Sequence, residues 1–123
     1  MKTEFKFEKI DIATSKMSEM VSFYTEIFEV RFKEIVENIN GKEWKLYLGN
    51  LGEIEFFLCP NEPSGTEENQ LGVHQFHLTV SEIEKFVETV RQKGIQVDQV
   101  PFGKGKLNFC LRDPDGNPWI LSN

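Results

Sequence analysis

The stretch that decides the fold is KIDIATSKMSEMVSFY, residues 9–24, whose pattern recurs 66 positions later as QFHLTVSEIEKFVETV, residues 75–90. Each stretch begins with alternating apolar and polar residues, which is typical of a half-buried strand. Each continues with apolar residues at positions i, i+3, i+4 and i+7, which predicts an amphipathic helix. These apolar stripes are Met17, Met20, Val21 and Tyr24 in the first copy and Ile83, Phe86, Val87 and Val90 in the second. The constant spacing predicts two copies of one strand–helix unit.

Residues that favour the beginning or the end of a helix flank both predicted helices. Ser15 and Ser81 precede the two stripes, and Ser81 followed by Glu84 has the spacing of a capping box. The first helix is expected to end near Glu29. The second is expected to end at Gly94, because glycine readily adopts the left-handed conformation that closes a helix.

Three further strands are predicted after each helix. Those after the first helix are residues 31–36, 45–49 and 53–59, and those after the second are residues 96–100, 106–112 and 118–122. Turn-forming residues at 49–52 and 113–117 separate the last two strands of each set. Both copies then have the order β-α-β-β-β, which predicts the α+β class.

The 123 residues fit a single domain made of two modules. Module one covers about residues 5–59 and module two about residues 73–123. The polar segment 60–72 between them lacks apolar periodicity and is interpreted as a linker. Residues 101–105, with two glycines, are expected to form a flexible stretch at the rim of a pocket.

The composition excludes several classes of partner. Twenty acidic and 14 basic side chains give a net charge of −6, and the basic residues are scattered, so neither nucleic acid nor a membrane is an expected partner. The first residues lack the apolar core of a secretory signal, and no apolar run is long enough to span a bilayer. Cys59 and Cys110 are interpreted as reduced thiols, so a cytoplasmic protein is expected.

Strand phase predicts which side chains face away from the helices. In the segment 53–59, Glu55, Phe57 and Cys59 lie opposite the apolar face. The corresponding residues of module two are Gln75, His77, Asn108 and Cys110. A large aromatic residue such as Phe57 on an otherwise polar face is ordinary in a ligand pocket. A dimer contact would also explain it.

Three short motifs accompany the two βαβββ modules. They are Phe23-Tyr24 in the first helix, Lys93-Gly94-Ile95 at the end of the second, and DPDGN, residues 113–117, before the last strand. With these motifs the chain resembles the glyoxalase, bleomycin-resistance and extradiol-dioxygenase superfamily, also called vicinal oxygen chelate. The resemblance implies two modules that curl into an open barrel of mixed sheet, with a concave cavity for a small-molecule ligand, often a divalent metal, and a homodimer.

The resemblance also implies four metal-ligand positions, which read Lys9, Glu55, Gln75 and Ile120 in this chain. Only Glu55 is a carboxylate, whereas Gln75 is a weak oxygen donor, Lys9 is a cation and Ile120 has no donor atom. We therefore expect no catalytic metal and no other cofactor. Without a metal, Lys9 and Glu55 are candidates for an ion pair. A non-standard ligand set of Glu55, Gln75 and His77 is the alternative.

Two functions follow from these alternatives, and a purely structural or interaction domain is a third, less favoured one because it leaves the inward-facing polar residues without a role. The first is a metal-free protein of the drug-resistance type, which binds a small molecule without chemistry. The second is an enzyme, either a metal-dependent lyase, isomerase or dioxygenase with the non-standard ligand set, or an acid–base catalyst built on Glu55 and His77. In both cases the expected ligand pocket is lined by Lys9, Asp11, Glu55, Phe57, Gln75, His77, Asn108, Cys110 and Ile120.

Overall fold

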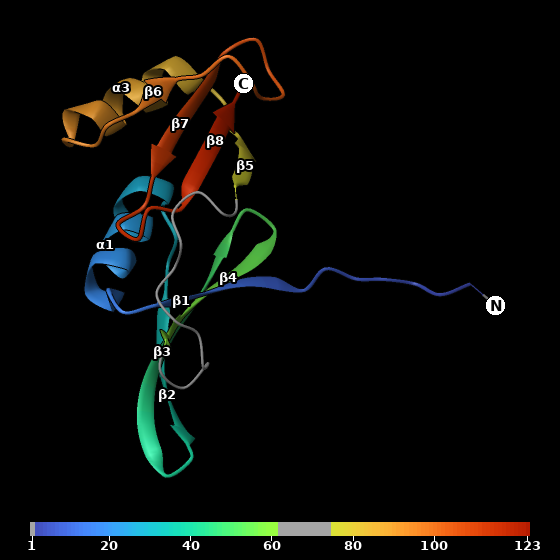
Figure 1. Cartoon of the computed structure of the whole chain (residues 1–123), viewed down its shortest axis with the longest axis vertical. Helices are drawn as coiled ribbons and strands as arrows, with labels where there is room; N and C mark the ends of the chain where they lie inside the picture. The colour runs from blue at the N-terminus through green and yellow to red at the C-terminus, as the bar shows by residue number, and fades with distance from the viewer. Residues whose placement is uncertain (1, 62–74) are drawn as a thin grey trace. The chain divides into compact units, whose positions relative to one another are not determined.

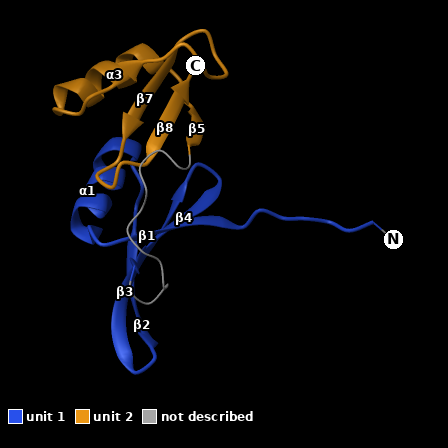
Figure 2. Ribbon diagram, viewed as in Figure 1, with its two compact units in different colours: residues 1–69 blue, residues 70–123 orange. Residues whose placement is uncertain are grey.

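The computed structural model describes residues 2–61 and 75–123. The chain divides into two units, residues 1–69 and residues 70–123 (Figure 2). Most of the predicted linker, residues 60–72, lies outside the described residues. None of the described helices is long and apolar enough to cross a membrane.

Unit 1 combines one described helix with a four-stranded mixed sheet (Figure 1). Its elements are β1 (Lys9–Thr14), α1 (Met17–Phe28), β2 (Lys33–Ile39), β3 (Lys42–Leu51) and β4 (Ile54–Pro60). The strands lie in the order β1-β4-β3-β2. Strand β1 is parallel to β4, and the other two pairings are antiparallel.

Unit 2 repeats this topology. Its elements are β5 (Phe76–Thr79), α3 (Ile83–Gln92), β6 (Asp98–Gln99), β7 (Asn108–Arg112) and β8 (Pro118–Ser122), and the strand order is β5-β8-β7-β6. Again only the first and last strands are parallel. The predicted pair of βαβββ modules is therefore confirmed. In neither sheet do the two outer described strands pair with each other, so neither sheet closes into a barrel.

The core of unit 1 lies between α1 and one face of the sheet. Ile12 and Leu58 are opposite each other in the β1–β4 register, and both are buried. The Tyr24 ring of α1 packs 4.6 Å from the Phe56 ring, measured between centroids. Burying such a side chain contributes about 1.5–3 kcal/mol. The apolar face predicted from strand phase is therefore the buried face.

The core of unit 2 is built in the same way. Val87 and Val90 of α3 are buried, as is Leu121 of β8. The Trp119 ring lies 4.9 Å from the Phe76 ring between centroids. The residues that alternate with these, His77 and Ile120, lie opposite each other on the other face of the sheet.

The two helices start at equivalent positions, but the predicted caps are wrong. Helix α1 follows Lys16, not Ser15, and the Lys16 N–H donates to Thr14 Oγ1 at 2.9 Å. Helix α3 follows Glu82, whose left-handed backbone (φ 50°) separates Ser81 from the first helical residue. Neither helix has a side-chain cap hydrogen bond, so the predicted capping box does not form.

The helix ends agree better with the sequence. Helix α1 is closed by Glu29 in the left-handed conformation (φ 58°), and the Val30 N–H donates to the Tyr24 carbonyl. Helix α3 ends at Gln92, and Gly94 adopts φ 83° just beyond it. A positive φ favours glycine, which explains Gly94, whereas Glu29 adopts this conformation as a non-glycine residue.

The turns of unit 1 differ from the prediction in two places. Gly49 is not in a turn: it lies buried within β3, where an added Cβ would be 2.7 Å from Val30 Cγ1. The turn between β3 and β4 is at Gly52 and the residue after it. The sequence prediction also missed the hairpin at Asn40-Gly41, where both residues have positive φ. Asn-Gly is the preferred pair for such a turn.

Candidate functional site

The polar face of the unit 1 sheet carries four of the residues expected to line a pocket. In the β1–β4 register Lys9 is opposite Glu55, and Asp11 is opposite Phe57. Because side chains alternate along a strand, these four residues share the face opposite the apolar core. Three of them are exposed and Phe57 is half-buried. The structure therefore brings one cation, two carboxylates and one aromatic ring together.

Lys9 contacts the aromatic ring of this face. Its Nζ lies 4.4 Å from the centroid of the Phe57 ring. This is a cation–π contact, worth about 0.5–1 kcal/mol at an exposed site. Among the described ion pairs there is none between Lys9 and Glu55, so the ammonium takes the ring and not the carboxylate as its partner.

The polar face of the unit 2 sheet carries His77, Ile120 and Cys110. His77 is opposite Ile120 in the β5–β8 register, and Ile120 is opposite Cys110 in the β7–β8 register. His77 is exposed, whereas Ile120 is fully buried and contributes no polar atom. Gln75 is exposed and directly precedes β5.

Asn108 has the predicted strand phase, but its amide is already bonded within unit 2. Its Oδ1 accepts from the Gly105 N–H at 3.1 Å and from the Ser122 hydroxyl at 2.6 Å. Its Nδ2 donates to the Gly105 carbonyl at 2.8 Å. The side chain is buried. These bonds make Asn108 a clamp for the loop that precedes β7.

The loop of residues 101–105 is therefore held at several points, although the sequence indicated a flexible stretch. The Lys104 N–H donates to Ser122 Oγ at 3.2 Å, in addition to the two bonds between Gly105 and Asn108. Close by, the Leu107 N–H donates to Asn123 Oδ1 at 3.1 Å. The sequence of the loop does not show that it is held, because two of its hydrogen-bond partners, Ser122 of β8 and Asn123, are far away in sequence.

The residues at the four positions implied for a metal do not fit a divalent cation. In unit 1 the single carboxylate, Glu55, lies opposite the ammonium-bearing Lys9. In unit 2 the positions are held by an amide, Gln75, and by the apolar Ile120. A divalent metal needs at least three anionic or neutral donors and is repelled by a nearby ammonium. Within residues 2–61 and 75–123, no three His, Cys, Asp or Glu residues cluster so as to hold a metal.

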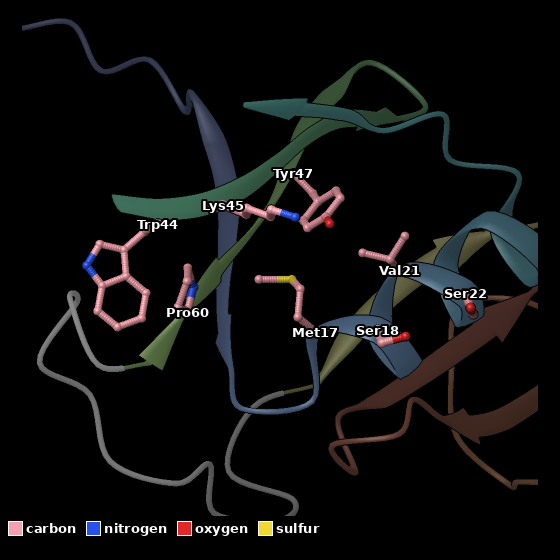
Figure 3. A pocket seen from close by; sticks show the side chains of 8 residues that line it. All are labelled: Met17, Ser18, Val21, Ser22, Trp44, Lys45, Tyr47 and Pro60. Carbon is pink, nitrogen blue, oxygen red and sulfur yellow. The ribbon is translucent and has the colours of Figure 1, made fainter. Parts of the chain in front are cut away.

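A pocket of about 480 Å³ lies in unit 1 between α1 and the sheet. Its size is within the range of small-molecule sites. Figure 3 shows the lining side chains, which come from α1, β3 and the end of β4. The lining residues are Met17, Ser18, Val21, Ser22, Trp44, Lys45, Tyr47 and Pro60.

Sequence periodicity did not reveal this pocket. Met17 and Val21 belong to the apolar stripe predicted to be core, yet both are half-buried and form pocket walls. The stripe that is buried continues instead through Phe23 and Ile27. At the rim, Lys45 pairs with a carboxylate of β2 and is mostly exposed. The pocket is thus an apolar and aromatic hollow with one neutralised cation.

A smaller hollow of about 260 Å³ lies in unit 2 and includes Cys110 and Arg112. Burial raises the pKa of the Cys110 thiol, Arg112 opposes that rise, and Asp98 adds to it. The Cys110 thiol is therefore protonated near neutral pH. A protonated thiol is a poor nucleophile, because the reactive form is the thiolate. Neither Cys59 nor Cys110 forms a disulfide bond within this chain.

A scan against protein-family models matches residues 6–121 to the Glyoxalase/Bleomycin resistance protein/Dioxygenase superfamily. The match covers nearly all of the chain. No curated protein matches it significantly in sequence.

Solved structures share the fold at low sequence identity. An antibiotic-binding protein from a Streptomyces species is 15% identical with a TM-score of 0.70, and the alignment covers 99% of this chain and 98% of that one. A mutant of the fosfomycin resistance protein FosX from Listeria monocytogenes, complexed with Mn(II) and a dihydroxypropylphosphonic acid, is 10% identical with a TM-score of 0.76 and coverages of 98% and 93%. A lactoylglutathione lyase from Agrobacterium tumefaciens is 15% identical with a TM-score of 0.66 and coverages of 98% and 94%.

Proposed function

Because this chain belongs to the Glyoxalase/Bleomycin resistance protein/Dioxygenase superfamily, we propose that it binds a small organic molecule and does so without a catalytic divalent metal. The fold alone does not decide between binding and catalysis, because similar structures include both an antibiotic-binding protein and a lyase. The choice depends on the side chains of the polar sheet faces.

The observation that carries the proposal is the placement of Lys9. It lies opposite Glu55, and its ammonium is 4.4 Å from the Phe57 ring centroid. A cation at this position disfavours a second cation nearby. The same group, beside an aromatic ring and two carboxylates, offers the stacking and hydrogen-bonding partners that an organic ligand uses. We therefore place the ligand on the face of Lys9, Asp11, Glu55 and Phe57.

The first test is metal content. The purified chain is dialysed against zinc, nickel, manganese and iron salts in turn, and bound metal is measured by elemental analysis. We expect far less than stoichiometric metal. Stoichiometric metal that is lost in Glu55→Ala or His77→Ala, but kept in the control Glu43→Ala, would refute the proposal and favour a metal-dependent enzyme. Glu43 is an exposed glutamate on β3 and suits this control.

The second test identifies and locates a ligand. A panel of antibiotics and metabolites is screened by thermal shift, with and without divalent metals, because a ligand that binds the native state raises its stability. Phe57→Ala should then weaken binding about tenfold, as expected for the loss of one aromatic contact. If binding instead survives in Phe57→Ala and is lost in Trp44→Ala, the ligand occupies the pocket between α1 and β3 and the proposed face is wrong.

A further inference from the structure

The chain before β1 forms an exposed arm, residues 2–8, that continues from the edge of the unit 1 sheet. Residues 2–9 are all exposed. The arm carries two large apolar side chains in water, Phe5 at 93% exposed and Phe7 at 70%. Figure 1 shows it as an extended blue segment leading into β1. β1 is the outer strand in the order β1-β4-β3-β2. Exposed apolar segments that extend an edge strand are ready to pair with another strand.

The arm alternates charge and apolar character with period two. Its sequence, KTEFKFE, places Lys2, Glu4, Lys6 and Glu8 at even positions. In an extended strand these four residues share one face and the two phenylalanines share the other. The structure agrees with this, since Lys6 Nζ lies 3.8 Å from a carboxylate oxygen of Glu8.

This alternation is complementary to itself when two arms run antiparallel. With Phe5 placed opposite Phe5 of the partner subunit, Lys2 faces Glu8 of the partner subunit and Glu4 faces the partner's Lys6. Two-fold symmetry repeats both contacts, so four opposite-charge pairs form and no like charges meet. Directly opposed side chains of opposite charge stabilise an antiparallel pair, and like charges destabilise it.

Neighbouring registers are less favourable. Moving the two-fold axis by one residue toward the N-terminus, onto Glu4, places Glu4 opposite the partner's Glu4 and Lys2 opposite the partner's Lys6. Moving it the other way, onto Lys6, places Lys6 opposite the partner's Lys6 and Glu4 opposite Glu8 of the partner subunit. Both shifts replace attraction with repulsion. The charge pattern therefore selects the register centred on Phe5.

We propose that residues 2–8 of two copies of this chain pair as antiparallel strands about a two-fold axis at Phe5, and that this arm pairing forms a homodimer. The paired segment is about 23 Å long. It places the phenylalanines of both copies on one face, where Phe5 contacts Phe5 of the partner subunit. This inference does not depend on whether a ligand binds.

Charge reversal tests the register. Glu4→Lys and Lys6→Glu each convert two attractive contacts into repulsive ones, so each should weaken dimerisation by about tenfold or more in sedimentation velocity. The double variant Glu4→Lys/Lys6→Glu should restore the dimer. An equimolar mixture of the two single variants should form heterodimers, because each arm then faces the opposite charge. Glu43→Lys, a reversal at an exposed position of β3, is the matched control and should leave dimerisation unchanged.

At concentrations low enough for the parent chain to be monomeric, the arm variants should leave unfolding temperatures unchanged, since these residues are exposed and lie outside every described helix and strand. The proposal is overturned if the wild-type chain is monomeric at high micromolar concentration. It is also overturned if the dimer survives both single reversals, or if neither the double variant nor the mixture restores it. In the last case the arm pairs with some other surface of the partner.

Discussion

Replacing Asn108 with alanine should destabilise unit 2 by about 3 kcal/mol. The substitution removes three hydrogen bonds, two with Gly105 and one with Ser122, with lengths between 2.6 and 3.1 Å. A buried hydrogen bond contributes roughly 1 kcal/mol, and partners left unsatisfied by truncation raise the cost. For a chain of this size, 3 kcal/mol corresponds to a fall in unfolding temperature of about 10 °C.

Urea unfolding followed by tryptophan fluorescence measures this effect. Trp119 is buried in unit 2 and Trp44 lies in unit 1, so a Trp44→Phe background makes the signal specific to unit 2. Asn123→Ala is the matched control, because it removes an exposed hydrogen bond to the same region and should cost less than about 1 kcal/mol.

The opposite result would restore the interpretation made from the sequence alone. If Asn108→Ala changes stability by less than about 0.5 kcal/mol while it weakens ligand binding, then Asn108 is a pocket residue and the loop does not depend on it. A loss of stability with unchanged ligand affinity, measured for any ligand found by the screen, supports the clamp.

Three further predictions concern backbone conformation and thiol chemistry. Gly41→Ala should lower the free energy of unfolding by about 1–2 kcal/mol, because Gly41 has φ 82°, a left-handed conformation that is unfavourable for alanine. An added Cβ meets no other atom within 4 Å, so the cost comes from the backbone conformation and not from a clash. A neutral result would contradict this explanation. Gly49→Ala should cost about 1–3 kcal/mol through overpacking against Val30, and thermal unfolding measures it. In a Cys59→Ser background, alkylation of Cys110 at mildly alkaline pH should be slower in the folded chain than in urea, because burial raises the pKa of this thiol when the chain folds. The raised pKa stabilises the folded chain at pH values below the thiol's ordinary pKa, and this stabilisation is lost as pH rises through the pKa of the thiol in the folded chain. The difference in stability between the parent and a Cys110→Ser variant should therefore change at alkaline pH. A difference that stays constant would contradict the raised pKa.

The faces of the sheets could be predicted from the sequence because alternation is a property of the strand itself. Alternation gives Ile12 and Leu58 the phase of the apolar face in their strands, and they are buried opposite each other. The same alternation gives Lys9 and Phe57 the phase of the other face. Pairing in register preserves phase, so a prediction made strand by strand survives assembly into a sheet.

Features that depend on distant residues could not be predicted in this way. A helical stripe shows which side of α1 is apolar, but not how far the sheet beneath it extends, so Met17 and Val21 could not be told apart from core residues. The left-handed backbone of Glu82 has no signal in its residue type. The Asn40-Gly41 hairpin does not depend on distant residues, because Asn-Gly is itself the preferred pair for a two-residue hairpin turn.

The partner chosen by Lys9 shows how small energies decide the chemistry of a site. Strand phase places its ammonium within reach of both Glu55 and Phe57, and the structure selects the ring at 4.4 Å. An exposed ion pair is worth about 0–1 kcal/mol and an exposed cation–π contact about 0.5–1 kcal/mol. Because these ranges overlap, residue types alone could not rank the two partners. The same small difference means that an anionic group of a ligand could draw Lys9 away from the ring at a cost of about 1 kcal/mol or less. A divalent metal ion has no such exchange available, because it cannot take the ammonium as a ligand and is repelled by it.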